Sequence, residues 1–144
     1  MRAIAFFLAS LWLPAAALAE TNIHAVCYED CAASTHSTPE YNACAARAAD
    51  KADAALNHAY KTLQDAVRAD GKEMGQSPDT QLGYLKDAQK QWIAFRDANC
   101  TFEDSLAFGG TSLGGNSSSC LCVLSYQRID DFARIKKDVM GTDE

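Results

Sequence analysis

The sequence predicts an all-α protein: a small, disulfide-stapled bundle of three main helices with a cysteine-bearing N-terminal segment packed on it. Three observations support this fold class. Apolar residues recur at helical spacing along three long segments, and no segment alternates with the period of two that is typical of strands. Six cysteines also follow a stretch that resembles an export signal. The 144 residues are enough for one domain.

The N-terminus has the layout of a cleaved signal peptide. Arg2 is a short basic region, residues 4–13 are mainly apolar, and Ala17-Leu18-Ala19 forms an A-x-A cleavage site before Glu20. We therefore expect cleavage after Ala19, which leaves residues 20–144 as a single domain. That domain is expected in the periplasm or outside the cell.

The charge of the chain argues against several classes of partner. There are 19 acidic and 13 basic residues, so the net charge of −6 becomes −7 once Arg2 is removed. Nucleic acid and anionic membrane surfaces select an excess of Lys and Arg, so neither is expected as a partner. No later apolar run reaches the ~18 residues of a transmembrane helix. The sequence does not predict an oligomeric state.

Two of the helix starts share one pattern. Thr38-Pro39-Glu40 and Ser77-Pro78-Asp79 each place a hydroxyl at the N-cap, proline at the first helical position and a carboxylate in the first turn. The expected left-handed C-terminal caps are Gly71, Gly109 and Gly141. The predicted helices cover about residues 39–70, 78–107 and 120–140.

Each predicted helix has an apolar stripe that we expect to face the core. In the first helix the stripe is clear only in the second half, because the first half is mostly alanine. Small side chains there would let the N-terminal segment 20–37 approach closely. The stripe residues are Leu56, Tyr60, Leu63 and Val67 in the first helix, Leu85, Ala88, Trp92, Phe95, Phe102 and Leu106 in the second, and Leu121, Leu124, Phe132, Ile135 and Val139 in the third.

The short turn at 71–77 predicts that the first two helices form an antiparallel hairpin. This pairing brings Cys44 near Cys100, and the third helix must start at the same end. All six cysteines therefore gather at one end of the bundle. We favour one bridge that closes the loop before the third helix and one that ties down the N-terminal segment, although other connectivities stay open. The favoured pairs are Cys31–Cys44, Cys100–Cys120 and Cys27–Cys122.

No residue pattern in the chain is typical of a catalytic, metal or cofactor site. The spacings Cys27-x3-Cys31 and Cys120-x-Cys122 do not match a zinc signature, and the histidines lack helical pairing. Glu103 and Asp104 are adjacent carboxylates, which point apart on a helix and so do not form a glycosidase pair. We expect no enzyme activity, no metal and no cofactor.

Arg128 stands where the stripe of the third helix calls for a hydrophobic side chain. A guanidinium that faces inward needs a carboxylate or amide partner, because an unpaired buried charge is unfavourable. From the expected register we predict that Arg128 pairs with Asp53, Asn57 or both. The cluster is either a polar lock that fixes helix register or, through Arg96 and Arg128, a site for an anion. Its predicted members are Asp53, Asn57, Gln89, Arg96 and Arg128.

The segment Gly109–Ser119 is rich in glycine and small hydroxyls, which predicts a flexible, exposed loop. It does not match a phosphate-binding loop, because no Lys-Ser/Thr follows it and no strand precedes it. It is either a plain connection between helices or a protruding loop that binds a partner. The residues of this candidate binding loop are Gly109, Gly110, Thr111, Ser112, Leu113, Gly114, Gly115 and Asn116.

Four stretches, taken in order, carry a family resemblance. They are Asp53-x-x-Leu56-Asn57-x-x-Tyr60, Ala88-Gln89-x-x-Trp92-Ile93-x-Phe95-Arg96-Asp97-Ala98-x-Cys100, Gly109-Gly110-Thr111, and Cys120-Leu121-x-x-Leu124-Ser125-x-x-Arg128. With them the chain resembles the LprI-type lysozyme inhibitor N-terminal domain family of small exported bacterial proteins. The resemblance covers roughly residues 31–136. It implies an α-helical domain outside the cytoplasm and, for the founding type, inhibition of lysozyme.

The chain departs from the family pattern in two ways. The family's namesake is a lipoprotein, whereas Glu20 and not cysteine follows the expected cleavage site. Cys27 and Cys122 are an additional pair beyond the four family positions.

The resemblance also predicts a partner. Common animal lysozymes are strongly cationic, so a chain of charge −7 would be attracted to them. On this hypothesis the loop 109–119 enters the sugar-binding cleft, and Glu103 and Asp104 meet the basic surface of the enzyme. The alternative is a periplasmic protein-interaction or immunity-like module that has no lysozyme activity.

Overall fold

The structure is a computed structural model that describes residues 23–112 and 114–141. Its elements are η1 (Ala25–Glu29), α2 (Asp30–Ser34), α3 (Thr38–Glu73), α4 (Asp79–Ser105), α5 (Gly115–Arg134) and η2 (Ile135–Val139), where η denotes a π-helical segment. The described residues contain no strand, so the predicted all-α class is confirmed. None of the described helices is long and apolar enough to cross a bilayer. The expected signal peptide lies outside the described residues.

The N-caps differ by one residue from the predicted Thr38 and Ser77: they are Ser37 for α3 and Pro78 for α4. Ser37 is the N-cap, and its hydroxyl accepts a hydrogen bond from the backbone N–H of Glu40 at 3.4 Å. The Glu40 carboxylate in turn accepts the N–H of His36 at 2.8 Å, so one N–H in the first turn and one ahead of the helix are satisfied. Gly71 was predicted to end this helix, and that prediction is wrong. The helix runs on to Glu73, and Gly75 takes the left-handed conformation instead.

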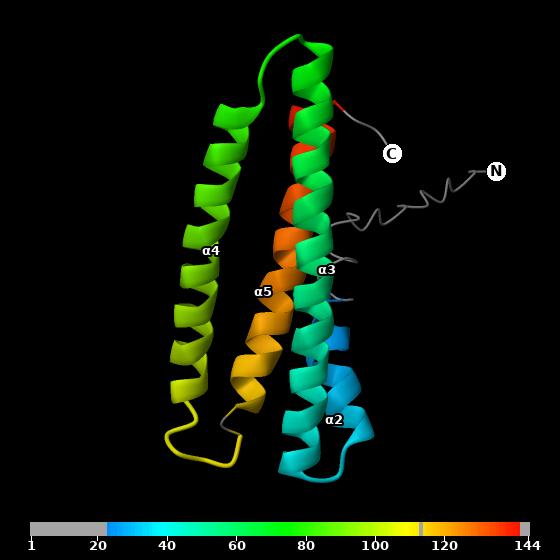
Figure 1. Cartoon of the computed structure of the whole chain (residues 1–144). Helices are drawn as coiled ribbons and strands as arrows, with labels where there is room; N and C mark the ends of the chain where they lie inside the picture. The colour runs from blue at the N-terminus through cyan, green and yellow to red at the C-terminus, as the bar shows by residue number, and fades with distance from the viewer. Residues whose placement is uncertain (1–22, 113, 142–144) are drawn as a thin grey trace, which may run out of the picture.

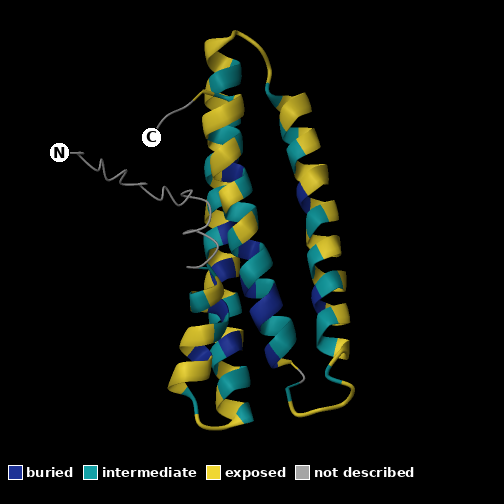
Figure 2. Ribbon diagram, turned by 180° about the vertical axis from the view of Figure 1, so that it is seen from behind, coloured by how far each residue is buried: buried dark blue, intermediate teal, exposed yellow. Residues whose placement is uncertain are grey.

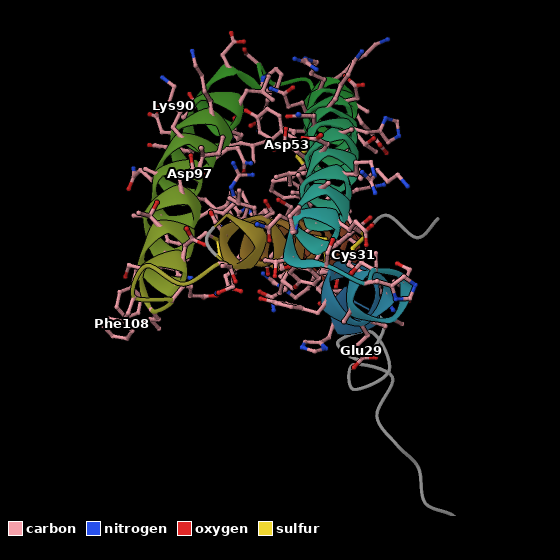
Figure 3. All side chains as sticks on the ribbon, turned by 90° about the horizontal axis from the view of Figure 1, so that it is seen from below. Glu29, Cys31, Asp53, Lys90, Asp97 and Phe108 are labelled. Carbon is pink, nitrogen blue, oxygen red and sulfur yellow. A yellow bond between two sulfur atoms is a disulfide. The ribbon has the colours of Figure 1, made fainter. Side chains whose placement is uncertain are left out.

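The helices pack as a bundle in which α5 is central (Figure 1). The turn between Glu73 and Asp79 joins α3 and α4 as the predicted antiparallel hairpin. However, α4 packs chiefly on α5, and the most extensive helix contact in the molecule is the one between α3 and α5. Seen from below in Figure 3, α3 and α4 both rest on α5 and diverge from each other.

The core consists of two small clusters along the contact between α3 and α5. Near the cysteine-rich end, Cys27, Ala52 and Cys122 are fully buried, and the alanines of α3 allow η1 to approach as expected. Towards the hairpin end, a second cluster is formed by Leu56, Leu63 and Phe132.

The apolar stripe predicted for α4 is only partly correct. Leu85 and Trp92 pack against the cluster of Leu56, Leu63 and Phe132. The stripe was also expected to bury Ala88, Phe95, Phe102 and Leu106, but these four side chains are exposed. The physical reason is that α4 has one main neighbour, so the opposite half of its surface stays in solvent. Figure 2 shows this as an outer side of α4 that is largely exposed.

Three disulfides staple the end of the bundle that holds the start of α3 and the start of α5. The structure joins Cys27 to Cys122, Cys31 to Cys44 and Cys100 to Cys120, with Cα–Cα distances of 5.7, 5.6 and 5.5 Å. These are the pairs favoured from the sequence. Together they attach η1 to α5, α2 to α3 and α4 to α5. The disulfides therefore make this end of the molecule a rigid support for the connection between α4 and α5.

Candidate functional site

The connection between α4 and α5, residues 106–114, protrudes from the stapled end and is called the α4–α5 loop below. It begins with tight turns, because the N–H groups of Leu106, Ala107 and Phe108 each donate to the carbonyl three residues earlier, at 3.1–3.2 Å. Phe108 then has a left-handed φ of +46°, which is unfavourable for a bulky residue. Its side chain is 90% exposed and points away from the bundle (Figure 3). A strained, exposed aromatic residue is typical of a binding position.

Asp104 holds the far side of this loop. Its Oδ1 atom accepts the backbone N–H of Gly114 at 2.8 Å and that of Ser117 at 3.2 Å. Gly114 is the N-cap of α5 and has no side chain to cap the helix, so the carboxylate of α4 satisfies that end from outside. One turn further along, the disulfide Cys100–Cys120 joins the same two helices. The loop is therefore tied at its base rather than freely flexible.

The predicted loop was too long at its C-terminal side. Gly115 and Asn116, assigned to the candidate binding loop, belong to the first turn of α5, which begins five residues before the predicted start at residue 120. Gly115 is buried against α3: a Cβ atom there would overlap Asn42 Oδ1 and lie 3.0 Å from Tyr41 Cε1. Tyr41 also hydrogen-bonds Ser119 at 3.1 Å between hydroxyl oxygens. The early helix start follows from this packing, which the sequence pattern does not reveal.

The remaining candidate loop residues lie as follows. Gly109 is left-handed with φ of +82°, and the N–H of Gly110 donates to the carbonyl of Ala107 at 2.8 Å. Thr111 and Ser112 continue the turn, and the Ser112 carbonyl accepts the N–H of Gly115 at 3.2 Å. Leu113 lies outside the described residues. Phe108 was missed from the sequence, although a bulky residue directly before a Gly-Gly pair is a usable signal for an exposed position.

The polar cluster joins all three long helices, but its pairing differs from the prediction. Arg96 on α4 donates to Asp53 Oδ1 on α3 at 3.0 Å and to Ser125 Oγ on α5 at 3.3 Å. Its side chain is 12% exposed, and its Nε also donates to Asp97 at 3.0 Å. Asn57 donates to the other oxygen of Asp53 at 3.1 Å. Arg96 is therefore the residue that binds Asp53.

Arg128 was predicted to bind Asp53 or Asn57, and this prediction is wrong. Its Nε donates to Gln89 Oε1 at 3.2 Å, and its Nη1 donates to Asp131 at 3.4 Å. The reason is direction: the side chain extends from α5 towards α4 rather than towards α3. Trp92 lies near both guanidinium groups, with ring-to-Cζ distances of 5.3 Å for Arg96 and 5.6 Å for Arg128.

A polar pocket of about 310 Å³ lies beside this cluster, between α3, α4 and α5. Its lining includes Asp50, Asp53, Arg96 and Ser125. Since Arg96 already pairs with Asp53 and Asp97, the pocket has no unpaired cation to attract an anion. Two carboxylates against one guanidinium make its mouth more suitable for a cationic group. Among the described residues, no cluster of metal-ligating side chains is found.

Comparisons with known proteins assign the chain to a family. Residues 29–132 match the model of a family described as lysozyme inhibitor LprI. An uncharacterized protein of Rhizobium meliloti (strain 1021) is 35% identical over 92 residues, which is 62% of this chain and 66% of that protein, just under two thirds of it. No solved structure matches significantly. Because the family model covers most of the chain, the chain belongs to the lysozyme inhibitor LprI family.

Proposed function

We propose that this member of the LprI family is an exported protein that binds and inhibits lysozyme, with the α4–α5 loop as its contact with the enzyme. Family membership carries the proposal, because it links the chain to inhibitors rather than to enzymes. The three disulfides are consistent with an exported protein. Removal of residues 1–19 would release the folded domain into the envelope.

The charge of the molecule supports a cationic partner. The net charge of −6, or −7 without Arg2, would steer the chain towards a basic enzyme and raise the rate of encounter. This attraction is long-ranged and weakens as salt is added, because the Debye length is about 8 Å at physiological ionic strength. Charge therefore supports association in general and does not by itself define the contact.

The α4–α5 loop supplies the features of a specific contact. Phe108 presents a large apolar surface at the tip, and aromatic residues are the commonest anchors of protein interfaces. Asp104 and the disulfide Cys100–Cys120 hold the base of the loop, so little conformational freedom is lost on binding. Insertion of such a loop into a sugar-binding cleft would block access of the substrate.

The test is a cell-wall lysis assay with two alanine variants. Phe108→Ala removes the proposed anchor and is expected to raise the inhibition constant by about tenfold or more, as expected for an aromatic hot spot. Val139→Ala is the control, since Val139 is also a strongly exposed apolar residue, at 71%, and lies on η2, far from the loop in sequence. If both variants inhibit equally well, the proposal that Phe108 is the anchor of the contact with lysozyme is contradicted. Deleting residues 113–117 is a poorer test, because Gly115 and Ser117 belong to the first turn of α5, where Gly115 packs on α3 and Ser117 donates to Asp104.

A second candidate function rests on the polar pocket. Asp50 and Asp53 at its mouth suit a Lys or Arg side chain, which a periplasmic partner other than lysozyme would offer. The chain would then be an envelope interaction or immunity-like module. In this case Asp50→Asn would weaken capture of the partner, whereas Phe108→Ala would leave it unchanged.

A further inference from the structure

The outer side of α4 carries an apolar stripe that the bundle leaves uncovered. Its residues follow one another at spacings of four and three, as in the heptad seam of a coiled coil. Tyr84, Phe95, Phe102 and Leu106 are 73%, 59%, 61% and 52% exposed. Large apolar side chains collected on one helix face are typical of a protein contact. The members of this outer stripe are Tyr84, Ala88, Gln91, Phe95, Ala98, Phe102 and Leu106.

The outer stripe contains no charged residue, although the whole chain is strongly acidic. Lys90 and Asp97, labelled in Figure 3, are five and two residues from Phe95, a spacing that puts them on other faces of a helix. A basic partner would be recognised by carboxylates, which the stripe lacks. In a contact with a second copy of the same chain, no charged side chain of the stripe would meet a like charge, and salt screens the long-range repulsion between the two acidic chains.

The order of side chains along the stripe is close to symmetric about Phe95. Tyr84 and Leu106 are each 11 residues from it, and Ala88 and Phe102 are each seven residues from it. Two antiparallel copies of α4 would therefore place Phe95 against Phe95 and the large Phe102 ring against the small Ala88. A two-fold contact requires this kind of self-complementary surface. Parallel pairing would instead set Phe102 against Phe102 and leave a gap between the two alanines.

We propose that the outer stripe of α4 binds the same stripe of a second copy, antiparallel, about a two-fold axis at Phe95. The two rings at the axis are free to adopt an offset or edge-to-face arrangement. The α4–α5 loops then lie at opposite ends of the helix pair, which separates them by roughly 40 Å for α4 segments with a rise of 1.5 Å per residue. Each Phe108 lies two residues beyond Leu106, the last member of the stripe.

The test is sedimentation equilibrium of the oxidised chain, residues 20–144, over a wide concentration range. The expected result is a reversible dimer that Phe95→Asp weakens by about tenfold or more, because two carboxylates would meet at the axis. Phe95 is exposed in the single chain, so the variant is expected to keep its helical circular dichroism. Val139→Asp, which adds the same charge at an exposed apolar position on η2, is expected to leave the dimer unchanged.

A charge-pair experiment tests the antiparallel register. Ala88→Lys and Phe102→Glu are each expected to weaken the dimer, and the double variant is expected to recover part of the affinity, because Lys and Glu would face each other across the two copies. A chain that stays monomeric at every concentration overturns the proposal. A dimer that resists Phe95→Asp overturns the outer stripe as its interface. A double variant weaker than either single one overturns the antiparallel register.

Discussion

Gly115 shows how one missing side chain sets the position of a helix. It is buried where the first turn of α5 meets Tyr41 and Asn42 of α3, and an added Cβ atom has no room there. We predict that Gly115→Ala lowers the free energy of unfolding by about 1–3 kcal/mol, as for other overpacked positions. Thermal or denaturant unfolding measures the change.

The matched control is Gly83→Ala on α4. A Cβ atom at Gly83 meets nothing within 4 Å, and the residue lies inside an exposed helix. Alanine there is expected to raise the free energy of unfolding by about 0.5–1 kcal/mol, because glycine loses more backbone entropy. The same sign for both variants would contradict the packing described at Gly115.

Tyr28 gives a prediction in pH. Burial raises the pKa of its phenol above 10.0, and coulombic interactions with Glu103 and Tyr41 raise it further. Since the folded pKa lies above the unfolded one, the folded state keeps the proton longer. Its contribution to stability is full below pH 10 and is lost as the pH rises through the raised folded pKa.

We therefore predict that Tyr28→Phe loses less stability between neutral and alkaline pH than the unmodified chain does. Thermal melting across this range measures the slope. Tyr84→Phe is the control, because Tyr84 is exposed on the outer stripe and its replacement also removes one phenol. A slope that changes equally in both variants would contradict the role of burial at Tyr28.

The polar cluster shows what residue patterns can and cannot predict. The inward position of Arg128 and the proximity of Asp53, Asn57, Gln89 and Arg96 follow from helical spacing and a rough register. The individual hydrogen bonds do not, because an arginine side chain is long enough to reach either neighbour. The structure shows that the Arg128 side chain extends from α5 towards Gln89 on α4, which leaves Asp53 to pair with Arg96.

At the scale of elements, the start of α5 depends on a residue of another helix. The N-cap of α5 is Gly114, which has no side chain to accept a hydrogen bond. The Asp104 carboxylate of α4 accepts two backbone N–H groups at this helix start instead. We predict that Asp104→Ala destabilises the protein by about 1 kcal/mol, the usual effect of losing a helix cap. Faster amide exchange of Gly114 and Ser117 is expected in the same variant.

Asp87→Ala is the control for this cap, since Asp87 is an exposed carboxylate on the same helix. It removes the same charge and is expected to leave the exchange of the α5 amides unchanged. If Asp104→Ala and Asp87→Ala behaved alike, the effect would be one of net charge and not of capping. If the α4–α5 loop contacts lysozyme, only Asp104→Ala is expected to weaken inhibition.

Helix α4 shows that an apolar stripe predicts a helix but does not predict which of its faces is buried. Its sequence predicts a helix correctly, because the periodicity of 3.6 is strong. The same helix has one apolar side that meets α5 and a second that stays exposed, and periodicity does not say which side meets a neighbour. That information comes from the position of α5, which lies against α3 along most of its length.

At the scale of the whole molecule, helical periodicity and the short turn made the fold predictable, and the gathering of the six cysteines at one end supported it. Two long helices joined by a short turn leave few ways to bring six cysteines together, so the hairpin geometry and the favoured pairs constrain each other. The extent of the α4–α5 loop was less predictable, because glycine and serine are poor helix formers in isolation. Residues 115–119 are helical because tertiary packing on Tyr41 and Asn42 outweighs this weak propensity.

The molecule as a whole combines a stapled end that carries Phe108 with an uncovered stripe on α4. We propose that the first contacts lysozyme and the second contacts another copy of the chain, and the two proposals are tested separately. If the chain inhibits lysozyme but stays monomeric, the proposal for the Phe108 loop stands and the proposal for the α4 stripe is contradicted. If the chain dimerises but does not inhibit lysozyme, the proposal for the α4 stripe stands and the proposal for the Phe108 loop is contradicted.

The most direct test is inhibition of c-type, g-type and i-type lysozymes by the oxidised chain, residues 20–144, in a cell-wall lysis assay. We predict sub-micromolar inhibition of at least one type, weakened about tenfold or more by Phe108→Ala and unchanged by Val139→Ala. Absence of inhibition of all three types at about 100 μM, a concentration at which even weak binders of this kind are largely bound, would contradict the proposed function.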